Sequence, residues 1–161
     1  IIGFDIAGAE LNFRPSLYKE TFKKVKDEGI NITIHAGEGD NVDSISDALQ
    51  NGAKRIGHGV RIIEDIDIVN NKLGETATYI VDNQIPLEIC ITSNIHTNMY
   101  ERYDKHPVVE LIKYGFNVSI NTDNRLMSNT DINNELLICK NIGIKDPEEL
   151  LIKSASYSFL N

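Results

Sequence analysis

The sequence has few cysteines and lacks a long hydrophobic run. Its two cysteines, Cys90 and Cys139, each lie in an apolar stretch. One disulfide and two free thiols both fit this count, and two buried thiols in a reducing cytoplasm are the favoured interpretation. The apolar runs are short, as at residues 136–139, whereas a membrane-spanning helix needs about 20 apolar residues. We therefore expect no membrane partner and a cytoplasmic location.

Positive charge is also scarce. The chain has 16 basic and 24 acidic residues, which gives a formal net charge of −8. Nucleic-acid binding depends on neutralising phosphates with Lys and Arg, so this balance argues against a nucleic-acid partner. A hydrophobic content of 41% and a charged content of 25% are typical of folded globular domains. No repeat, low-complexity tract or linker divides the sequence, so we treat residues 1–161 as a single unit.

The chain opens with Ile1-Ile2-Gly3-Phe4-Asp5, without an initiating Met. These residues already have the character of a buried strand, and a natural amino terminus seldom begins inside a strand. We therefore expect this chain to be a fragment whose N-terminal part precedes residue 1.

Short runs rich in Ile and Val alternate with amphipathic stretches. They predict strands at residues 2–6, 30–34, 55–56 with their flanks, 85–91 and 116–120. This composition is typical of strands buried on both faces. Apolar spacings of three and four predict helices over residues 18–29, 42–51, 66–80 and 108–115, and Asp146-Pro147 predicts a further helix start. The alternation implies a parallel sheet, either open or closed into a barrel.

A polar side chain follows each predicted strand. In a (β/α)₈ barrel the carboxyl ends of all strands converge on one mouth, where catalytic groups collect. In an open sheet only the strand ends near a switch point meet. The barrel is therefore favoured by the five polar strand ends, which are Asp5, His35, His58, Ser93-Asn94 and Asp123.

Two short segments have the composition of a reaction site. In His35-Ala36-Gly37-Glu38, small residues let the chain turn tightly, so that Glu38 re-enters the site beside a potential zinc ligand. In Gly57-His58-Gly59 the flanking glycines permit close backbone approach to a ligand and leave the imidazole standing in the open. For residues 35–38 the alternative is a hydrogen-bonded His at a strand end, with Glu38 near the start of the next helix. For residues 57–59 the alternative is an ordinary turn with an incidental His.

The remaining candidates carry weaker signals. Asp123, within Asn121-Thr122-Asp123-Asn124, is a candidate hard-oxygen ligand, although Asn and Asp also commonly cap turns. His96 and His106 lie among polar residues, and we interpret both as solvated loop histidines.

These motifs, taken in order, resemble the adenosine deaminase family. The resemblance rests on residues 3–10 (GFDIAGAE), 35–38 (HAGE), 57–59 (GHG) and 121–124 (NTDN), and covers roughly residues 1–128. The continuation Arg125-Leu126-Met127-Ser128 looks like the version found in bacterial members. The resemblance implies the carboxyl-terminal portion, about strands 4–8, of a TIM-type (β/α)₈ barrel.

The resemblance also implies a zinc ion and its ligands. The family binds one zinc through two His of an early His-x-His strand, a later His and an Asp. His35 and Asp123 match the last two, whereas no His-x-His occurs in this chain. The implied activity in the full-length protein is hydrolytic deamination of adenosine and 2′-deoxyadenosine to the inosine form and ammonia, a reaction of purine metabolism.

Roles for five further residues follow from the same resemblance. Glu38 protonates the ring nitrogen beside the reacting carbon, and His58 orients the attacking hydroxide. Gly8 offers its backbone N–H to a purine ring nitrogen, and Asp5 is assigned to substrate binding. Asn124 stands where the animal enzymes have an Asp that contacts the imidazole side of the purine, and its amide can donate the same hydrogen bond.

Two other functions remain as alternatives. One is a deaminase for free adenine or another aminopurine, and the other is a non-catalytic purine-binding module. For the 161-residue chain alone, with half of the zinc ligands, we expect no useful activity. We also expect self-association through its open strand edges.

Overall fold

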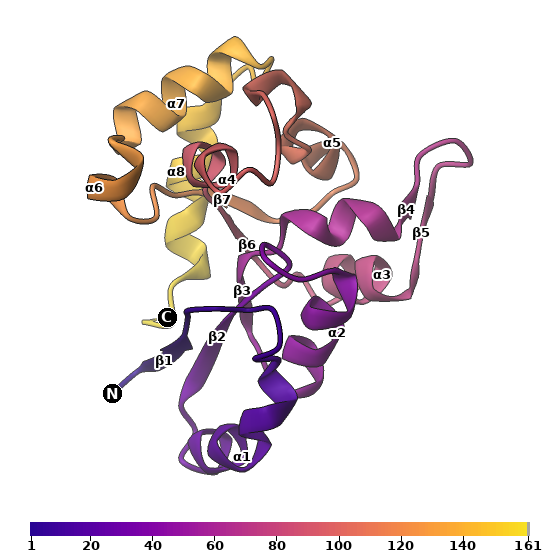
Figure 1. Ribbon diagram of the computed structural model, residues 1–161, viewed down its shortest axis with the longest axis vertical. Coiled ribbons are helices and arrows are strands. Elements are labelled where there is room, and N and C mark those ends of the chain that lie inside the picture. Colours follow the sequence, from indigo (N-terminus) through magenta and orange to yellow (C-terminus); the bar gives the residue numbers. More distant parts are fainter. Residues whose placement is uncertain (161) are drawn as a thin grey trace.

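The computed structural model, which describes residues 1–160, is built on one parallel five-stranded sheet (Figure 1). Its strands lie in the order of the sequence, and every neighbouring pair is parallel. They are β1 (Gly3–Ile6), β2 (Asn31–Ala36), β3 (Arg55–His58), β6 (Leu87–Ile89) and β7 (Val118–Ile120). The five strands predicted from the sequence are thus confirmed, and each carboxyl end lies at the same edge of the sheet.

Helical segments follow every strand, and those that connect consecutive strands cover one face of the sheet. Before β3 they are η1 (Pro15–Tyr18), α1 (Lys19–Asp27) and α2 (Val42–Gln50). Between β3 and β7 they are η2 (Val60–Asp65), α3 (Glu75–Asp82), α4 (Ile91–His96), η3 (Tyr103–Lys105) and α5 (Val108–Lys113). After β7 come α6 (Arg125–Ser128), α7 (Ile132–Asn141), α8 (Pro147–Ser154) and η4 (Ala155–Tyr157). Asp146 caps α8 by accepting the Glu149 backbone N–H, as its sequence predicts.

The hydrophobic core lies between the sheet and these helices. Alternate residues of β2, β3, β6 and β7 point into it and are fully buried, as are large apolar side chains of the helices, while Phe4 and Ile6 of β1 are partly buried against it. The strands contribute Ile32, Ile34, Ile56, Leu87, Ile89 and Ile120, and the helices contribute Phe22, Ile45, Ile80 and Leu111.

The other face of the sheet is polar, but in β2, β3, β6 and β7 its residues are buried or half-buried, which agrees with the expectation of strands buried on both faces. The parallel register places Asp5, Thr33 and Arg55 side by side, and His35, Gly57, Glu88 and Ser119 form the next row. Ile and Val dominate these strands in sequence because they fill the helix-facing positions. The alternating polar residues are the ones that build a site.

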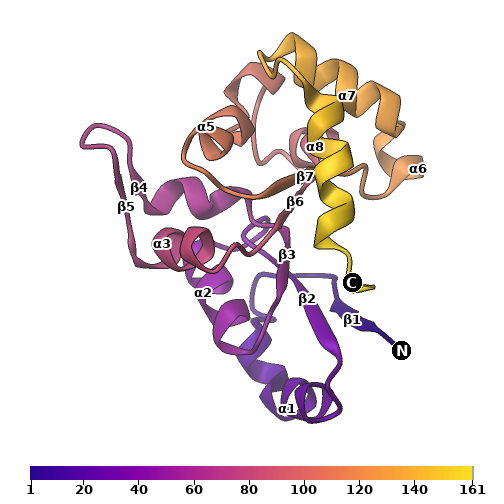
Figure 2. The same cartoon turned by 180° about the vertical axis from the view of Figure 1, so that it is seen from behind.

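Arg55 forms the centre of a polar cluster on this face. Its guanidinium lies 2.9 Å from a Glu88 carboxylate oxygen and donates to Thr33 Oγ1 and the Tyr157 carbonyl, both at 3.2 Å. The ring of Phe159 stacks on it, 4.4 Å from its Cζ atom. The end of the chain therefore returns to the start of the sheet, and the C-terminus lies near β1 in Figures 1 and 2.

The predicted helix over residues 66–80 is wrong in its first half. Residues 66–73 form a hairpin of β4 (Ile66–Asp67) and β5 (Lys72–Leu73), which projects from the body in Figures 1 and 2. The helix begins only after Gly74, because Asp65 accepts the Ala77 N–H at 2.8 Å and the Gly74 N–H bonds the Asp65 carbonyl. Val69 is 94% exposed, so its helical spacing was a coincidence.

Two further sequence expectations concern the thiols and the membrane. Cys90 and Cys139 are both buried free thiols, and burial raises the pKa of each. Within residues 1–160 every helix is too short or too polar to cross a bilayer.

Candidate active site

His35 stands at the end of β2 on the polar face of the sheet. Its Nδ1 lies 3.3 Å from an Asp5 carboxylate oxygen on the neighbouring strand, and this hydrogen bond raises the pKa of His35. The ring fits because Gly57 is opposite, where a Cβ would lie 2.8 Å from Nδ1. A carboxylate on one ring nitrogen is the usual arrangement for a histidine that offers the other nitrogen to a metal.

His58 ends β3 with its ring against that of His35, at a centroid separation of 5.2 Å. Its backbone is left-handed, with φ of 60°, a conformation that non-glycine residues adopt rarely and often at functional sites. The side chain is buried, and this burial lowers the pKa of His58. The expectation that its imidazole stands in the open is therefore wrong. The flanking glycines make room for protein groups, since a Cβ on Gly59 would meet Leu87 at 2.8 Å.

Glu38 turns back toward His58, as its motif predicts. The turn depends on Gly37, whose φ is 73° and where a Cβ would collide with Ile45. One carboxylate oxygen of Glu38 lies 3.4 Å from His58 Nε2. The other accepts hydrogen bonds from Asn94 Nδ2 at 2.7 Å and Thr97 Oγ1 at 3.3 Å. A carboxylate and an imidazole are thus brought into contact at adjacent strand ends.

Glu10 holds the turn that carries Glu38. Its carboxylate accepts the backbone N–H groups of four consecutive residues, 37–40, together with the Ser44 hydroxyl at 2.5 Å. The sequence motif that contains Glu10 gave it no role. Glu10 lies four residues after the end of β1, and no local sequence pattern indicates this contact, because the partners are 27–34 residues away.

Asp123 follows β7 at the same edge and also has a left-handed backbone, with φ of 52°. One carboxylate oxygen accepts the Ser93 hydroxyl at 2.7 Å. Asn124 caps α6 by accepting the Met127 N–H with its amide oxygen, which leaves its NH₂ group to donate. Gly8 lies in the exposed loop after β1 with φ of 123°.

The group around α4 received no catalytic role from the sequence, although Ser93-Asn94 was expected at a polar strand end. Asn94 is completely buried and contacts both Glu38 and His58. His106 is 5% exposed and bonds Asn94, so its interpretation as a solvated loop histidine is wrong. It lies just before α5, and its polar neighbours Asp104 and Lys105 are exposed whereas the His106 ring is buried. His96 is exposed, as expected, but ends α4 rather than lying in a loop.

Three of the predicted site residues, His35, His58 and Asp123, share one cavity of about 150 Å³, whereas Glu38, Asp5, Gly8 and Asn124 lie outside its lining. It is lined by His35, Gly57, His58, Glu88, Cys90, Asn121 and Asp123. Within residues 1–160 no three His, Cys, Asp or Glu side chains are grouped to hold a metal ion. The imidazole of His35 and the carboxylate of Asp123 are ligand types that zinc accepts, and a structural or catalytic zinc site usually has four ligands.

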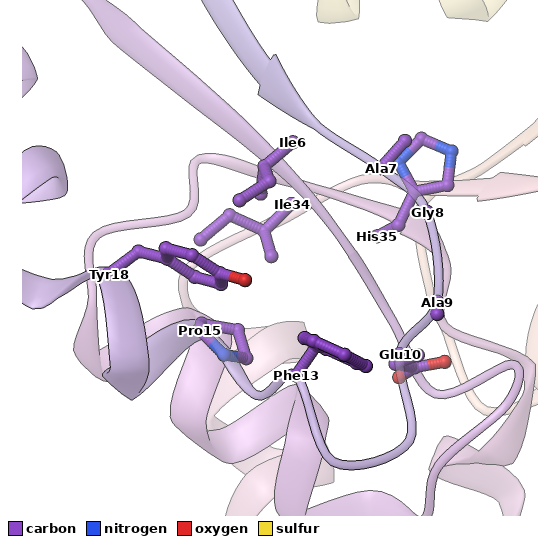
Figure 3. A pocket seen from close by; sticks show the side chains of 10 residues that line it. All are labelled: Ile6, Ala7, Gly8, Ala9, Glu10, Phe13, Pro15, Tyr18, Ile34 and His35. Atoms are coloured by element: carbon purple, nitrogen blue, oxygen red, sulfur yellow. The ribbon is translucent and has the colours of Figure 1, made fainter.

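A second cavity, of about 220 Å³, adjoins the first beside Gly8 (Figure 3). Figure 3 shows Gly8, Glu10 and His35 on one side of it and the rings of Phe13 and Tyr18 on the other. The two cavities share His35, so a polar pocket and a more apolar one meet at this residue.

The family model for adenosine deaminase matches residues 1–160. The chain belongs to the adenosine deaminase family. Adenosine deaminase 1 of Streptomyces coelicolor is 46% identical over 139 residues, and adenosine deaminase of Mycolicibacterium vanbaalenii is 43% identical over 141. These alignments cover 84% and 85% of this chain but 35% and 39% of the relatives. The chain thus spans little more than a third of their length.

Solved structures agree with the family at the level of the fold. Adenine deaminase from Arthrobacter aurescens superposes on the whole chain with a TM-score of 0.89 at 25% identity, over 48% of its own length. The N6-methyl-AMP deaminase from Arabidopsis thaliana does so with a TM-score of 0.81 at 27% identity, over 46%. The fold class predicted from the sequence, part of a (β/α)₈ barrel, is confirmed.

Proposed function

We propose that the complete gene product is a zinc-dependent hydrolase that converts adenosine and 2′-deoxyadenosine, with water, to the inosine form and ammonia. The observation that carries this proposal is the contact between Glu38 and His58 beside His35, at the carboxyl ends of two adjacent strands. Membership of the adenosine deaminase family supports it. The two free thiols support a cytoplasmic location.

In this proposal His35 and Asp123 supply two of the zinc ligands. Asp5 keeps Nδ1 of His35 occupied, and Ser93 donates to one oxygen of Asp123, so each ligand has one atom left for the metal. Two further ligands come from outside this chain. When bound, zinc supplies a Lewis acid that makes a water-derived nucleophile available near neutral pH.

Glu38 and His58 divide the proton chemistry between them. Protonated Glu38 donates to the purine ring nitrogen beside the carbon under attack, so that negative charge does not build up on the ring. His58 hydrogen-bonds the attacking oxygen and fixes its direction of approach. The buried position of His58 strengthens this interaction, because water cannot compete for it.

The loops at the carboxyl ends of the strands bind the substrate. The N–H of Gly8 bonds a purine ring nitrogen from the loop after β1. The amide NH₂ of Asn124 donates to the imidazole side of the purine, because its oxygen is already engaged in capping α6. Asp5, assigned from the sequence to the substrate, lies against His35 and acts there through the ring.

A second candidate is deamination of free adenine or of another aminopurine. It is favoured by the superposition on a structure named as an adenine deaminase, with a TM-score of 0.89. The chemistry at the amino-bearing carbon is the same, and the difference lies in what binds the rest of the substrate.

The test is an assay of the purified complete gene product with adenosine, 2′-deoxyadenosine, adenine and N6-methyl-AMP, measuring ammonia release and zinc content. We expect about one zinc per chain and the highest kcat/KM with adenosine. Higher turnover of adenine would favour the second candidate. Purine binding without turnover or zinc would instead identify a non-catalytic binding module.

The matched variants are Glu38→Gln and Glu101→Gln. The first removes the proton donor and is expected to lower kcat at least ~100-fold. The second removes an exposed carboxylate of the same type from the segment between α4 and η3, and kcat should stay within about twofold. Equal activity of Glu38→Gln and the parent would contradict the proposed role.

A further inference from the structure

A chain of hydrogen bonds leads from the main chain of α5 to the two candidate catalytic residues. The Val108 N–H donates to His106 Nδ1 at 3.2 Å, and His106 Nε2 lies 3.2 Å from the Asn94 amide oxygen. Asn94 Nδ2 lies 2.7 Å from Glu38 Oε1 and 3.2 Å from His58 Nδ1. Asn94, His106 and His58 are 0%, 5% and 2% exposed, so water does not take the place of these partners.

The donor and acceptor roles along this series of hydrogen bonds follow from the Val108 N–H, with which it begins. A backbone N–H can only donate, so His106 Nδ1 must accept and the ring proton must sit on Nε2. Nε2–H then donates to Asn94, whose amide oxygen therefore faces His106. The two hydrogens of the Asn94 NH₂ group are left for Glu38 and His58. His58 Nδ1 must accept, which puts the proton of a neutral His58 on Nε2, toward Glu38.

His106 suits this role because it stays neutral. It is surrounded by apolar and neutral groups, and Tyr100 lies against its ring at a centroid distance of 5.1 Å. Burial lowers the pKa of His106 to about 3. A charged ring would donate from both nitrogens and oppose the Val108 N–H, whereas the neutral ring has one donor and one acceptor in the required order.

We propose that Asn94 and His106 are positioning residues that fix His58 in its Nε2–H form and fix the orientation of the Glu38 carboxylate. Neither residue lines the cavity that contains His35 and Asp123, so both act through other side chains. The inference rests on the proposed deaminase function for its kinetic consequence, because Nε2 is the His58 atom that faces the reacting groups. The tautomer itself is a property of the protein that can be measured without substrate.

The experiment uses the complete gene product labelled with ¹⁵N-histidine, and NMR identifies which ring nitrogen of His58 carries the proton. A His58→Gln variant assigns the signals. In the parent we expect the proton on Nε2. His106→Phe keeps a ring beside Tyr100 but removes the donor, and the His58 proton should then distribute between both nitrogens. Asn94→Asp presents only acceptors to His58, and the proton should move to Nδ1.

Kinetics supply the second readout. His106→Phe should lower kcat roughly 10- to 100-fold, the scale expected when catalytic groups lose alignment, and should change KM less than about threefold. His106→Gln keeps a donor near Nε2 and should recover most of the loss. His96→Phe is the matched control at an exposed position of α4 and should leave kcat within about twofold.

The outcomes separate this inference from the proposed function. The positioning role of Asn94 and His106 is overturned if the parent His58 carries its proton on Nδ1. It is also overturned if the proton stays on Nε2 in both His106→Phe and Asn94→Asp. Absence of deamination by the parent contradicts the proposed function, while the NMR comparison still tests whether Asn94 and His106 fix the His58 tautomer. If His106→Phe fails to fold, Asn94→Asp provides the same test, with Asn98→Asp as its exposed control.

Discussion

Replacing Glu10 with Gln tests whether one carboxylate shapes the turn that carries Glu38. In the structure, Oε2 of Glu10 accepts the N–H groups of residues 38–40 at 3.0, 2.5 and 3.2 Å. Oε1 accepts the Gly37 N–H and the Ser44 hydroxyl. A Gln amide has the same shape but one acceptor atom, so its NH₂ group must oppose donors at one of the two ends.

The magnitude follows from which bonds survive. The least costly orientation keeps the amide oxygen toward residues 38–40, where charge-assisted bonds become neutral ones. The Gly37 N–H retains a second acceptor, Ser44 Oγ at 2.9 Å. A hydrogen bond to a charged group contributes about 1.5–3 kcal/mol and a neutral one about 1 kcal/mol. Because Glu10 is partly exposed, water offsets some of the loss, and we expect about 2 kcal/mol of destabilisation in total.

The assay combines urea unfolding of the complete gene product with amide hydrogen exchange over residues 37–40. Exchange should accelerate in Glu10→Gln more than elsewhere, and kcat should fall because Glu38 loses its alignment. Glu28→Gln neutralises an exposed carboxylate at the end of α1 and serves as the control. Unchanged exchange at residues 37–40, together with a change in unfolding free energy below about 0.5 kcal/mol, would refute the reasoning.

Three further predictions concern other parts of the site and the sheet. Gly57→Ala places a Cβ 2.8 Å from the His35 ring. Metal analysis should therefore detect less zinc, and urea titration should show a free energy of unfolding lower by about 1–3 kcal/mol. Burial lowers the pKa of His106 to about 3 in the folded protein. As the pH falls, His106 is therefore protonated in the unfolded chain at a higher pH than in the folded one. The unfolding free energy should therefore decrease below about pH 6.5, by up to ~1.4 kcal/mol per pH unit, and His106→Gln should flatten this slope, whereas equal slopes would contradict it. The isolated 161-residue chain leaves the outer edges of β1 and β7 unpaired within its described residues, so light scattering should detect self-association and an adenosine assay should detect no turnover.

The strands were predictable because the signal that marks them is local. Each buried run, such as residues 30–34, is short, rich in β-branched residues and followed by a polar strand end. The failure at residues 66–80 has the opposite cause. Apolar residues there match helical spacing, but the Asp67 side chain bonds the Asn70 N–H at 3.1 Å and closes a turn that periodicity does not detect. Turn chemistry therefore overrides the apolar pattern in that segment.

The site was predictable for residues that lie at strand ends and for Glu38, which follows a strand end in a short glycine-containing turn. His35, His58 and Asp123 converge because parallel strands deliver their carboxyl ends to one edge. His106 and Glu10 reach the same region from other segments, through contacts with partners 12 or more residues away. No local spacing records such contacts, and a polar neighbourhood in sequence made His106 resemble a surface residue although it is buried.

The pair of Arg55 and Glu88 has a consequence for how this sheet can change over evolution. Truncating Arg55 alone leaves a Glu88 carboxylate whose pKa burial already raises, and truncating Glu88 alone leaves an unpaired guanidinium beneath Phe159. Replacing both with apolar groups of similar volume avoids either penalty. Substitutions at these two positions are therefore expected to occur together among relatives. A sequence that has lost one charge should have lost the other.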